Sequence, residues 1–480
     1  MSVTDLLAGL GGLGGLGGLG GPAGRRSRRG TVRRQVHVAA STAQALYLPA
    51  AAVGLGTSGV IIGKELYSGR GFIYDPFTLY GDVLPGPNAL VAGETGNGKS
   101  ALVKSYCIRQ VRFGRQVAVL SVKRQHGPAD QPGQPDQPGQ PGLGERAGED
   151  EWAAPTRAVG GVVVTFRPGG QSSCINPLDP AIPAHLQLWL VRAMVEAASA
   201  PLGERALYAL KVARKTAVTA AGRGRRVATL PAVAVALLAP SAKAAAFAFP
   251  EVEEAEAVRR LVEVGRDVAL ALDRLCDPDG DLAGMLDGPT RIRLAGTARG
   301  GLDALLAAPM VDFDLSLVNS NGPALPVLMA VLGTWLNHAW LRADGVKRLL
   351  VVEEAWMLVA TAQMAALFEE LLKFARGLGL SLVAVVHHLS DLADSTESEA
   401  LLKMASTRVL YQMKAAEAAE TGRRLGLPAW AVESIPTLQR GVAVWDVAGN
   451  CQLVQHVTTA AERTVVYSDS AMLEQPAARM

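Results

Sequence analysis

Cysteine is scarce in this sequence, and its spacing excludes two classes of protein. The four cysteines of the 480-residue chain, Cys107, Cys174, Cys276 and Cys451, lie far apart and form no CxxC pair or Cys/His cluster. A zinc site or a disulfide scaffold would need such clustering, so we expect reduced thiols. The chain also lacks a large excess of either sign of charge, because the formal net charge is only +3. That value is too small to argue for a nucleic-acid partner.

Long, uniform hydrophobic runs are lacking too. The stretch at 45–63 is interrupted by glycine and proline, and the stretch at 325–341 contains an Asn-His step. The second stretch is therefore predicted to be a buried core helix and not a transmembrane helix. At the N-terminus a Gly/Leu run precedes the arginines, which is not the order of a signal peptide. We expect a cytoplasmic protein whose contact with any membrane is peripheral.

The order of segments predicts a folded core with two additions. Residues 1–35 combine the Gly/Leu repeat with six arginines and are predicted to be a disordered tail, whose contact with lipid or nucleic acid stays open. Residues 36–184 are the first part of the core, with a Pro/Gly/Gln repeat at 127–150 as a surface loop. Residues 185–305 have helical periodicity and predict a helical insertion domain, and 306–472 complete the core.

Continuous apolar strands alternate with helical segments in both parts of the core. Strands are predicted at 88–92, 116–122, 161–166, 310–318, 348–352 and 380–386, and helices at 323–343 and 361–376. Such alternation is typical of a parallel sheet covered on both faces, so the predicted fold class is α/β. Further strands are expected in RVLYQM, RGVAVWDV and CQLVQHV, the last two as an antiparallel pair.

A phosphate-binding motif follows the first of these strands. GETGNGKS fits the pattern G-x-x-x-x-G-K-S, in which glycines let backbone N–H groups surround a phosphate and the next helix offers its positive end. Lys99 is expected to reach the β- and γ-phosphates of a nucleotide, and Ser100 to hold Mg²⁺. The predicted binding residues are Gly93, Glu94, Thr95, Gly96, Asn97, Gly98, Lys99 and Ser100.

Two adjacent carboxylates end a later hydrophobic strand. RLLVVEEAWML places Glu353 and Glu354 where burial of acidic groups is costly unless their charge is compensated. In a P-loop fold this position lies beside the metal, so Glu353 is predicted to contact Mg²⁺ directly or through water. Glu354 is predicted to act as the general base that polarises the attacking water. An exposed acidic strand end is the structural alternative.

Polar residues around the next strand are further candidates. His387 and His388 follow that strand, where His387 is placed either to sense a γ-phosphate or to form a surface hydrogen bond. Arg376 ends the preceding helical segment and either stabilises that helix end or contacts phosphate, within its own subunit or across a subunit boundary. Arg408 and Arg440 are alternatives for such a contact in trans, and the sequence does not rank the three arginines.

The motifs occur in an order that resembles a known family. FIYDPFTLYG, GETGNGKSALVKSY, INPLDP, LAGMLDGPT, VVEEAW, ARGLGLSLVAVVHHLSDL and RGVAVW follow one another within residues 59–472. Together they resemble the VirB/TraC-like motor ATPases of type IV secretion and conjugation systems, a branch of the HerA/FtsK superfamily of P-loop NTPases, and most of all its actinobacterial members. A GTPase or a transporter cassette is disfavoured, because the sequence has no NKxD or LSGGQ-like segment.

The resemblance implies a RecA-like P-loop NTPase core with a mostly parallel central sheet and an all-helical insertion domain. It also implies a homo-oligomer, usually a hexamer, that uses ATP and Mg²⁺ and docks to other secretion or conjugation components at the inner face of the cell membrane. Lys99 and Ser100 match the Walker A pair, and Glu353 and Glu354 match the Walker B acid and the catalytic glutamate. His387 stands where relatives often carry a glutamine sensor.

The sequence departs from the family pattern at two places and keeps one structural motif. Where relatives often read D-x-K-G-E after the second strand, SVKRQH has Ser121 in place of the acid and keeps only Lys123. Glu353 replaces the usual aspartate. Asn176 and Asp179, in INPLDP, are predicted to shape a turn through Asx hydrogen bonds.

Three functions follow from these patterns. The first is an ATP-hydrolysing motor of a conjugative or type IV secretion system, which couples hydrolysis to assembly of the apparatus or to transfer of DNA or protein. The second is an FtsK-like or coupling-protein-like DNA translocase, for which salt-dependent DNA binding is expected. The third is a scaffold that binds nucleotide without hydrolysing it.

Overall fold

The computed structural model describes residues 55–123, 150–169, 172–294, 302–319, 322–341, 344–355, 377, 379–389, 399 and 402–466. The N-terminal tail at 1–35, nearly all of the loop at 127–150, and the predicted helix at 361–376 with Arg376 lie outside these residues.

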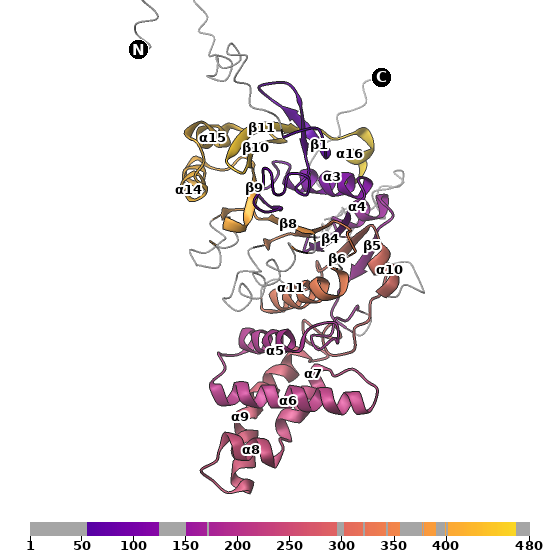
Figure 1. Cartoon of the computed structure of the whole chain (residues 1–480), viewed down its shortest axis with the longest axis vertical. Helices are drawn as coiled ribbons and strands as arrows, with labels where there is room; N and C mark the ends of the chain where they lie inside the picture. The colour runs from indigo at the N-terminus through magenta and orange to yellow at the C-terminus, as the bar shows by residue number, and fades with distance from the viewer. Residues whose placement is uncertain are drawn as a thin grey trace, which may run out of the picture. The chain divides into compact units, whose positions relative to one another are not determined.

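Eleven strands of the described part form one mixed sheet (Figure 1). Their order across the sheet is β2-β1-β11-β10-β9-β3-β8-β7-β4-β6-β5. The seven strands from β9 to β5 are parallel, whereas the pairings among β2, β1, β11, β10 and β9 are antiparallel. The strands are β1 (Val60–Glu65), β2 (Gly71–Tyr74), β3 (Asn88–Ala92), β4 (Gln116–Ser121), β5 (Val162–Thr165), β6 (Met310–Asp314), β7 (Arg348–Val352), β8 (Leu380–Val385), β9 (Ala405–Leu410), β10 (Val442–Val447) and β11 (Asn450–His456).

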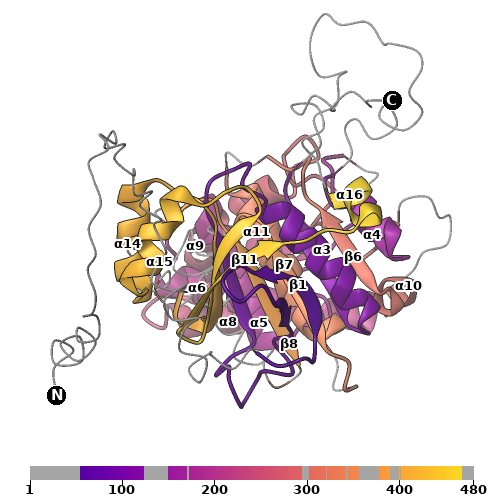
Figure 2. The same cartoon turned by 90° about the horizontal axis from the view of Figure 1, so that it is seen from above.

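The helices fall into those that cover the sheet and a group that is contiguous in sequence, α5 to α9. The α-helices are α3 (Lys99–Arg112), α4 (Ala153–Ala158), α5 (Ala184–Ala198), α6 (Glu204–Arg223), α7 (Leu230–Leu238), α8 (Ala242–Ala248), α9 (Glu254–Leu275), α10 (Leu302–Ala307), α11 (Ala324–Trp335), α14 (Ala415–Leu425), α15 (Ala429–Ser434) and α16 (Ala460–Val466). A π-helical turn, Leu336–Trp340, continues α11. Figure 2 shows α16 beside α3 and α4, with which it is in contact.

The central strands are buried on both faces, as their unbroken apolar sequences predict. Successive side chains of a strand point to opposite faces, so β4 divides its residues between two cores. Val117 and Val119 pack in the cluster that contains Tyr106 of α3, whereas Ala118 and Leu120 pack in the cluster that contains α11. Figure 1 shows α3 and α11 on opposite sides of the strands. The predicted α/β class with a mostly parallel, doubly covered sheet is confirmed.

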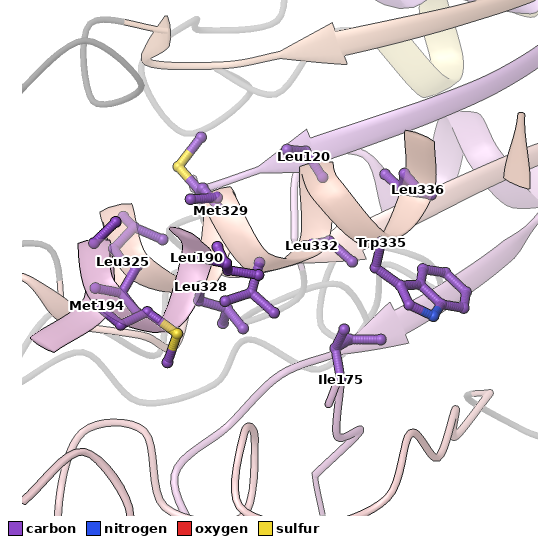
Figure 3. Close-up of a cluster of buried hydrophobic side chains, with 14 of the residues drawn as sticks. Leu120, Ile175, Leu190, Met194, Leu325, Leu328, Met329, Leu332, Trp335 and Leu336 are labelled. Atoms are coloured by element: carbon purple, nitrogen blue, oxygen red, sulfur yellow. The ribbon is translucent and has the colours of Figure 1, made fainter. Parts of the chain in front are cut away.

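Helix α11 joins the sheet to the helical group. All of its residues except Pro326 are buried, which confirms the predicted core helix in this stretch. Figure 3 shows Leu325, Leu328 and Met329 of α11 around Leu190 and Met194 of α5. Burying such side chains is worth about 1.5–3 kcal/mol each, so this cluster is a main attachment of the helical group.

The strand predicted at 310–318 ends early, at Asp314. The backbone N–H of Ser316 donates to the Asp314 carboxylate at 3.0 Å, which forms an Asx turn that stops the strand. The predicted antiparallel pairing of the last two strands, β10 and β11, is confirmed.

In the described residues, no single helix has both the length and the hydropathy needed to cross a bilayer, although α7 and α8, bent by 72° at their junction, pass that test as a pair.

Candidate nucleotide site

The predicted phosphate loop connects β3 to α3, between Ala92 and Lys99. Gly93, Gly96 and Gly98 have φ angles of 138°, 86° and 105°, which side chains other than glycine rarely adopt. A Cβ at Gly93 would lie 2.6 Å from the Cβ of Tyr411. The sequence places its glycines where the backbone of the loop must turn and where it packs closely against the end of β9.

Three backbone hydrogen bonds fix the loop to neighbouring segments. The Gly93 N–H donates to the carbonyl of His387 at 3.2 Å, and the Glu94 N–H donates to that of Gln412 at 2.9 Å. The Gly441 N–H donates to the Asn97 carbonyl at 2.9 Å. The loop is therefore held in place by the residues that follow β8 and β9 and by the start of β10.

Lys99 is buried with its ammonium directed back onto the loop. Its Nζ donates to the carbonyl of Glu94 at 2.9 Å and also to that of Gly93. Burial, followed by the nearby charge of Lys123, lowers the pKa of Lys99 to about 8. A buried ammonium whose hydrogen bonds within the described residues go to neutral carbonyls is well suited to an anionic ligand, because a phosphate would compensate its charge.

The paired carboxylates lie at the same edge of the sheet as the loop. Strand β8 lies between β3 and β7 in a parallel arrangement, so the carboxyl ends of all three strands meet there. Glu353 follows β7 and is 2% exposed, and its Oε2 has no hydrogen-bond partner within the described residues. Burial raises the pKa of Glu353, an effect that the charge of Lys123 opposes. A cation would satisfy this unpaired oxygen.

Glu354 is held in a network that reaches the phosphate loop. Its Oε1 lies 3.0 Å from Nζ of Lys123 and 2.9 Å from Nε2 of His387. On the other side of the ring, His387 Nδ1 lies 3.3 Å from the Thr95 hydroxyl. Burial raises the pKa of Glu354, but the hydrogen bond from His387 and the charge of Lys123 outweigh it and lower the pKa to about 2. The carboxylate is therefore ionised at neutral pH.

The two histidines have different surroundings. His387 joins Glu354 to the loop, whereas Nδ1 of His388 lies 2.9 Å from Oε1 of Glu417 in the first turn of α14. The residues alone left both histidines open, and only the family resemblance pointed to His387.

The structure describes the surroundings of two of the three arginines considered for a contact in trans. Arg408 lies within β9 directly opposite Asp446 of β10, and the two side chains form an ion pair at 2.8 Å. Arg440 precedes Gly441, whose N–H holds the phosphate loop. Arg376 lies outside the described residues.

Sequence reasoning missed two features of this edge. Lys123 was noted only as the remnant of a family motif, although it compensates the charge of Glu354. Ser121, which replaces the usual acid, has its hydroxyl 2.6 Å from an oxygen of Asp150 and 3.0 Å from an oxygen of Asp312. Burial raises the pKa of both aspartates, that of Asp150 to about 7. The only signal of this cluster was the unusual acidic residue at the centre of strand 310–314.

The INPLDP motif forms the predicted turn. Oδ1 of Asn176 accepts from the Leu178 N–H at 2.9 Å, and Oδ1 of Asp179 accepts from the Ala181 N–H at 2.9 Å. The other oxygen of Asp179 accepts from the hydroxyl of Thr290, in the LAGMLDGPT motif. The predicted structural role is confirmed, and these two motifs are joined in space.

Comparisons with known proteins reveal a similar fold. No protein-family model and no curated protein matches the sequence. Among solved structures, VirB4 of Thermoanaerobacter pseudethanolicus is similar with a TM-score of 0.63 and 19% identity, over 86% of this chain and 100% of that chain. The bacterial conjugative coupling protein TrwBdeltaN70 is similar with a TM-score of 0.50 and 15% identity, over 87% of this chain and 93% of that chain. At these identities the likeness is one of fold, and the expected P-loop NTPase architecture is confirmed.

Proposed function

We propose that this protein is a Mg²⁺-dependent ATPase that powers a conjugative or type IV secretion system. The observation that carries the proposal is the convergence of Lys99, the unpaired oxygen of Glu353 and the network around Glu354 at one edge of the sheet. The fold likeness to VirB4 and to a conjugative coupling protein supports the cellular role. From the family resemblance we further propose a hexamer that docks peripherally at the membrane.

The residues present fit a nucleotide and its metal. Lys99 would hold the β- and γ-phosphates in place of the loop carbonyls that it now contacts. Ser100 and Glu353 would hold Mg²⁺, which would neutralise charge on the triphosphate. The glycines of the loop leave backbone N–H groups free of side-chain obstruction at the start of α3.

Glu354 would orient the attacking water. Its carboxylate is ionised and held at a fixed point by Lys123 and His387, so it can accept a hydrogen bond from water. His387 would report on a γ-phosphate, a role that its contacts with Thr95 of the loop and with Glu354 support. Arg376 and Arg440 are the proposed arginines for phosphate contact, since Arg408 is paired with Asp446.

Two variants test this function. Lys99→Ala should abolish ATP turnover, whereas Glu354→Gln should still bind ATP and hydrolyse it about 10²–10⁴-fold more slowly, because only the transition state loses the carboxylate. ATP binding is measured by calorimetry and turnover by phosphate release. Matched controls are Lys403→Ala and Glu399→Gln, which alter an exposed i,i+4 pair and should leave both values unchanged. Full hydrolysis by the Glu354→Gln protein would remove that residue from the mechanism.

A further inference from the structure

The basic residues of this chain are distributed unevenly. Eight of the 47 lysines and arginines lie between residues 205 and 250, where none of the 44 acidic residues occurs. The remainder of the chain thus carries 39 basic against 44 acidic residues. Although the net charge is small, the charged residues of segment 205–250 are all basic, and this segment contains most of α6 and all of α7 and α8.

Helix α6 directs part of this charge to solvent along one face. Positions 211, 215, 218 and 222 follow one another at spacings of four and three residues, so they share a face. Lys211, Lys215, Val218 and Gly222 occupy these positions, and all four are exposed. The buried residues of α6, Ala209, Leu210, Ala213 and Ala217, form the opposite face. The lysines therefore lie on the side of α6 that faces away from the helical group.

The positive charge continues into the connection between α6 and α7. Arg223 ends α6, and Arg225 and Arg226 follow after one glycine; all three arginines are exposed. We call Lys211, Lys215, Arg223, Arg225 and Arg226 the basic face. Its length from 211 to 223 is about 18 Å at the helical rise of about 1.5 Å per residue.

The basic face is not neutralised by the protein. None of its five members forms an ion pair with any residue that the structure describes. Within 205–250, an ion pair is present only at Arg205, which lies 3.8 Å from Glu251. Arg214 donates to the neutral side-chain amide of Gln187. Five exposed cations without counter-charges repel one another, so a polyanion that binds them would relieve this repulsion.

We propose that the basic face binds the phosphodiester backbone of nucleic acid. Over about 18 Å of axis a duplex presents about ten phosphate charges, enough to engage all five cations. Arginine matches phosphate geometry with two parallel hydrogen bonds, and lysine acts as a point charge. The other two residues of this stripe, Val218 and Gly222, are small and leave the backbone of a duplex room to approach.

A lipid surface fits this face less well. Helices that lie on anionic bilayers combine basic residues with large apolar residues that insert among the acyl chains. Within residues 211–227 of the described structure, the exposed large apolar residues are Val218 and Val227. The more exposed Val235 and Leu238 belong to α7, and the ring of Phe247 stacks on Tyr208 with centroids 5.2 Å apart.

This inference goes beyond the proposed ATPase and is independent of it. None of the residues of the basic face belongs to the candidate nucleotide site. A variant that neutralises the face should therefore retain basal ATP turnover, and a failure of the ATPase proposal would leave the nucleic-acid measurement unaffected.

The test compares three full-length proteins: wild type; a five-site variant with Lys211, Lys215, Arg223, Arg225 and Arg226 changed to Gln; and a charge-matched control with Arg259, Arg260, Arg266, Lys403 and Arg423 changed to Gln. The control residues are all exposed, and each variant removes five positive charges. Because every protein retains the N-terminal arginines, the comparison isolates the basic face.

Binding of a fluorescent 30-base-pair duplex and of a 30-nucleotide single strand is measured by anisotropy at several salt concentrations. Wild type and control should bind with affinities that fall steeply with salt, and the five-site variant should bind about tenfold or more weakly at 150 mM salt. Its salt slope should be shallower by up to about 4–5, since about 0.9 counterion is released per phosphate contact. Equal binding by all three proteins would overturn the proposal.

A second arm uses vesicles of phosphatidylglycerol and phosphatidylcholine in a sedimentation assay. The proposal expects the five-site changes to reduce nucleic-acid binding in the first arm. If instead they abolish sedimentation with vesicles and leave DNA binding at the wild-type level, the face is a lipid surface and the proposal is wrong. Circular dichroism on each protein verifies that the substitutions preserve the helices.

Discussion

At the scale of single residues, the most informative side chain is Lys123. It lies just beyond the carboxyl end of β4, which pairs with β7, so its ammonium meets Glu354 at the adjacent strand end. The sequence contained this lysine, but only the strand order reveals its partner. The direction of a side chain two residues beyond a strand end is set by the turn that follows, and local sequence patterns do not specify it.

Lys123→Ala should lower the turnover number about 10–100-fold and change ATP affinity much less. The substitution removes one of the described groups that hold Glu354, so the carboxylate proposed to orient water loses its fixed position while the phosphate loop stays intact. Steady-state hydrolysis and calorimetric ATP binding separate the two effects. Lys123→Arg should recover part of the rate, and an unaltered turnover number in Lys123→Ala would refute the positioning role.

The aspartates around Ser121 predict a pH effect on stability. The pKa of Asp150 is raised to about 7 in the folded protein, from about 3.9 in an unfolded chain. This contribution to stability is therefore fully present below about pH 4 and is lost as the pH rises through about 7. Between these limits the free energy of unfolding should fall by about 1–4 kcal/mol because of this group.

Asp150→Asn removes the titrating group and keeps an oxygen that can accept from Ser121. Urea unfolding at pH 5 and pH 8 should then show a smaller loss of stability in the variant than in wild type. Asp303→Asn, at an exposed position on α10, serves as the control. Identical pH dependence in wild type and Asp150→Asn would argue against a neutral Asp150 in the folded protein.

At the scale of elements, the strand and loop patterns were predictable because their causes are local. Unbroken apolar runs predicted β3, β4, β7 and β8, and the glycine spacing predicted the phosphate loop between β3 and α3. The contacts of that loop were not predictable, because they come from residues more than 290 positions away, after β8 and at the end of β9. The parallel pairing of β8 and β9 with β3 brings these residues to the phosphate loop. That pairing is a property of the folded sheet, and local sequence does not define it.

Gly93→Ala should abolish nucleotide binding with little loss of helix and strand content. The new Cβ would lie 2.6 Å from the Cβ of Tyr411, and φ at this position is 138°, so the loop must move. Gly222→Ala is the matched control, because it lies in α6 with no atom within 4 Å of its Cβ. The control should be neutral or stabilise the protein by up to about 1 kcal/mol. Retention of full ATP affinity in Gly93→Ala would contradict the tight packing of this loop.

At the scale of the whole molecule, one sheet carries both the candidate nucleotide site and the connection to the helical group. Side chains of β4 face α3 on one side and α11 on the other, and α11 in turn packs on α5. The overall composition predicted neither this connection nor the basic face of α6. A net charge averages over the chain, so it cannot reveal a local concentration of eight basic residues.

The central claim is that Lys99 and Glu353 serve a single Mg²⁺–ATP site, and a double-mutant cycle tests it most directly. Calorimetry gives the dissociation constant of Mg²⁺–ATP for wild type, Lys99→Met, Glu353→Gln and the double variant. If both side chains act on one bound nucleotide, the change in binding free energy of the double variant should differ from the sum of the two single changes by about 0.5–3 kcal/mol. Effects that add within about 0.3–0.5 kcal/mol, as expected for distant and independent positions, would contradict the account.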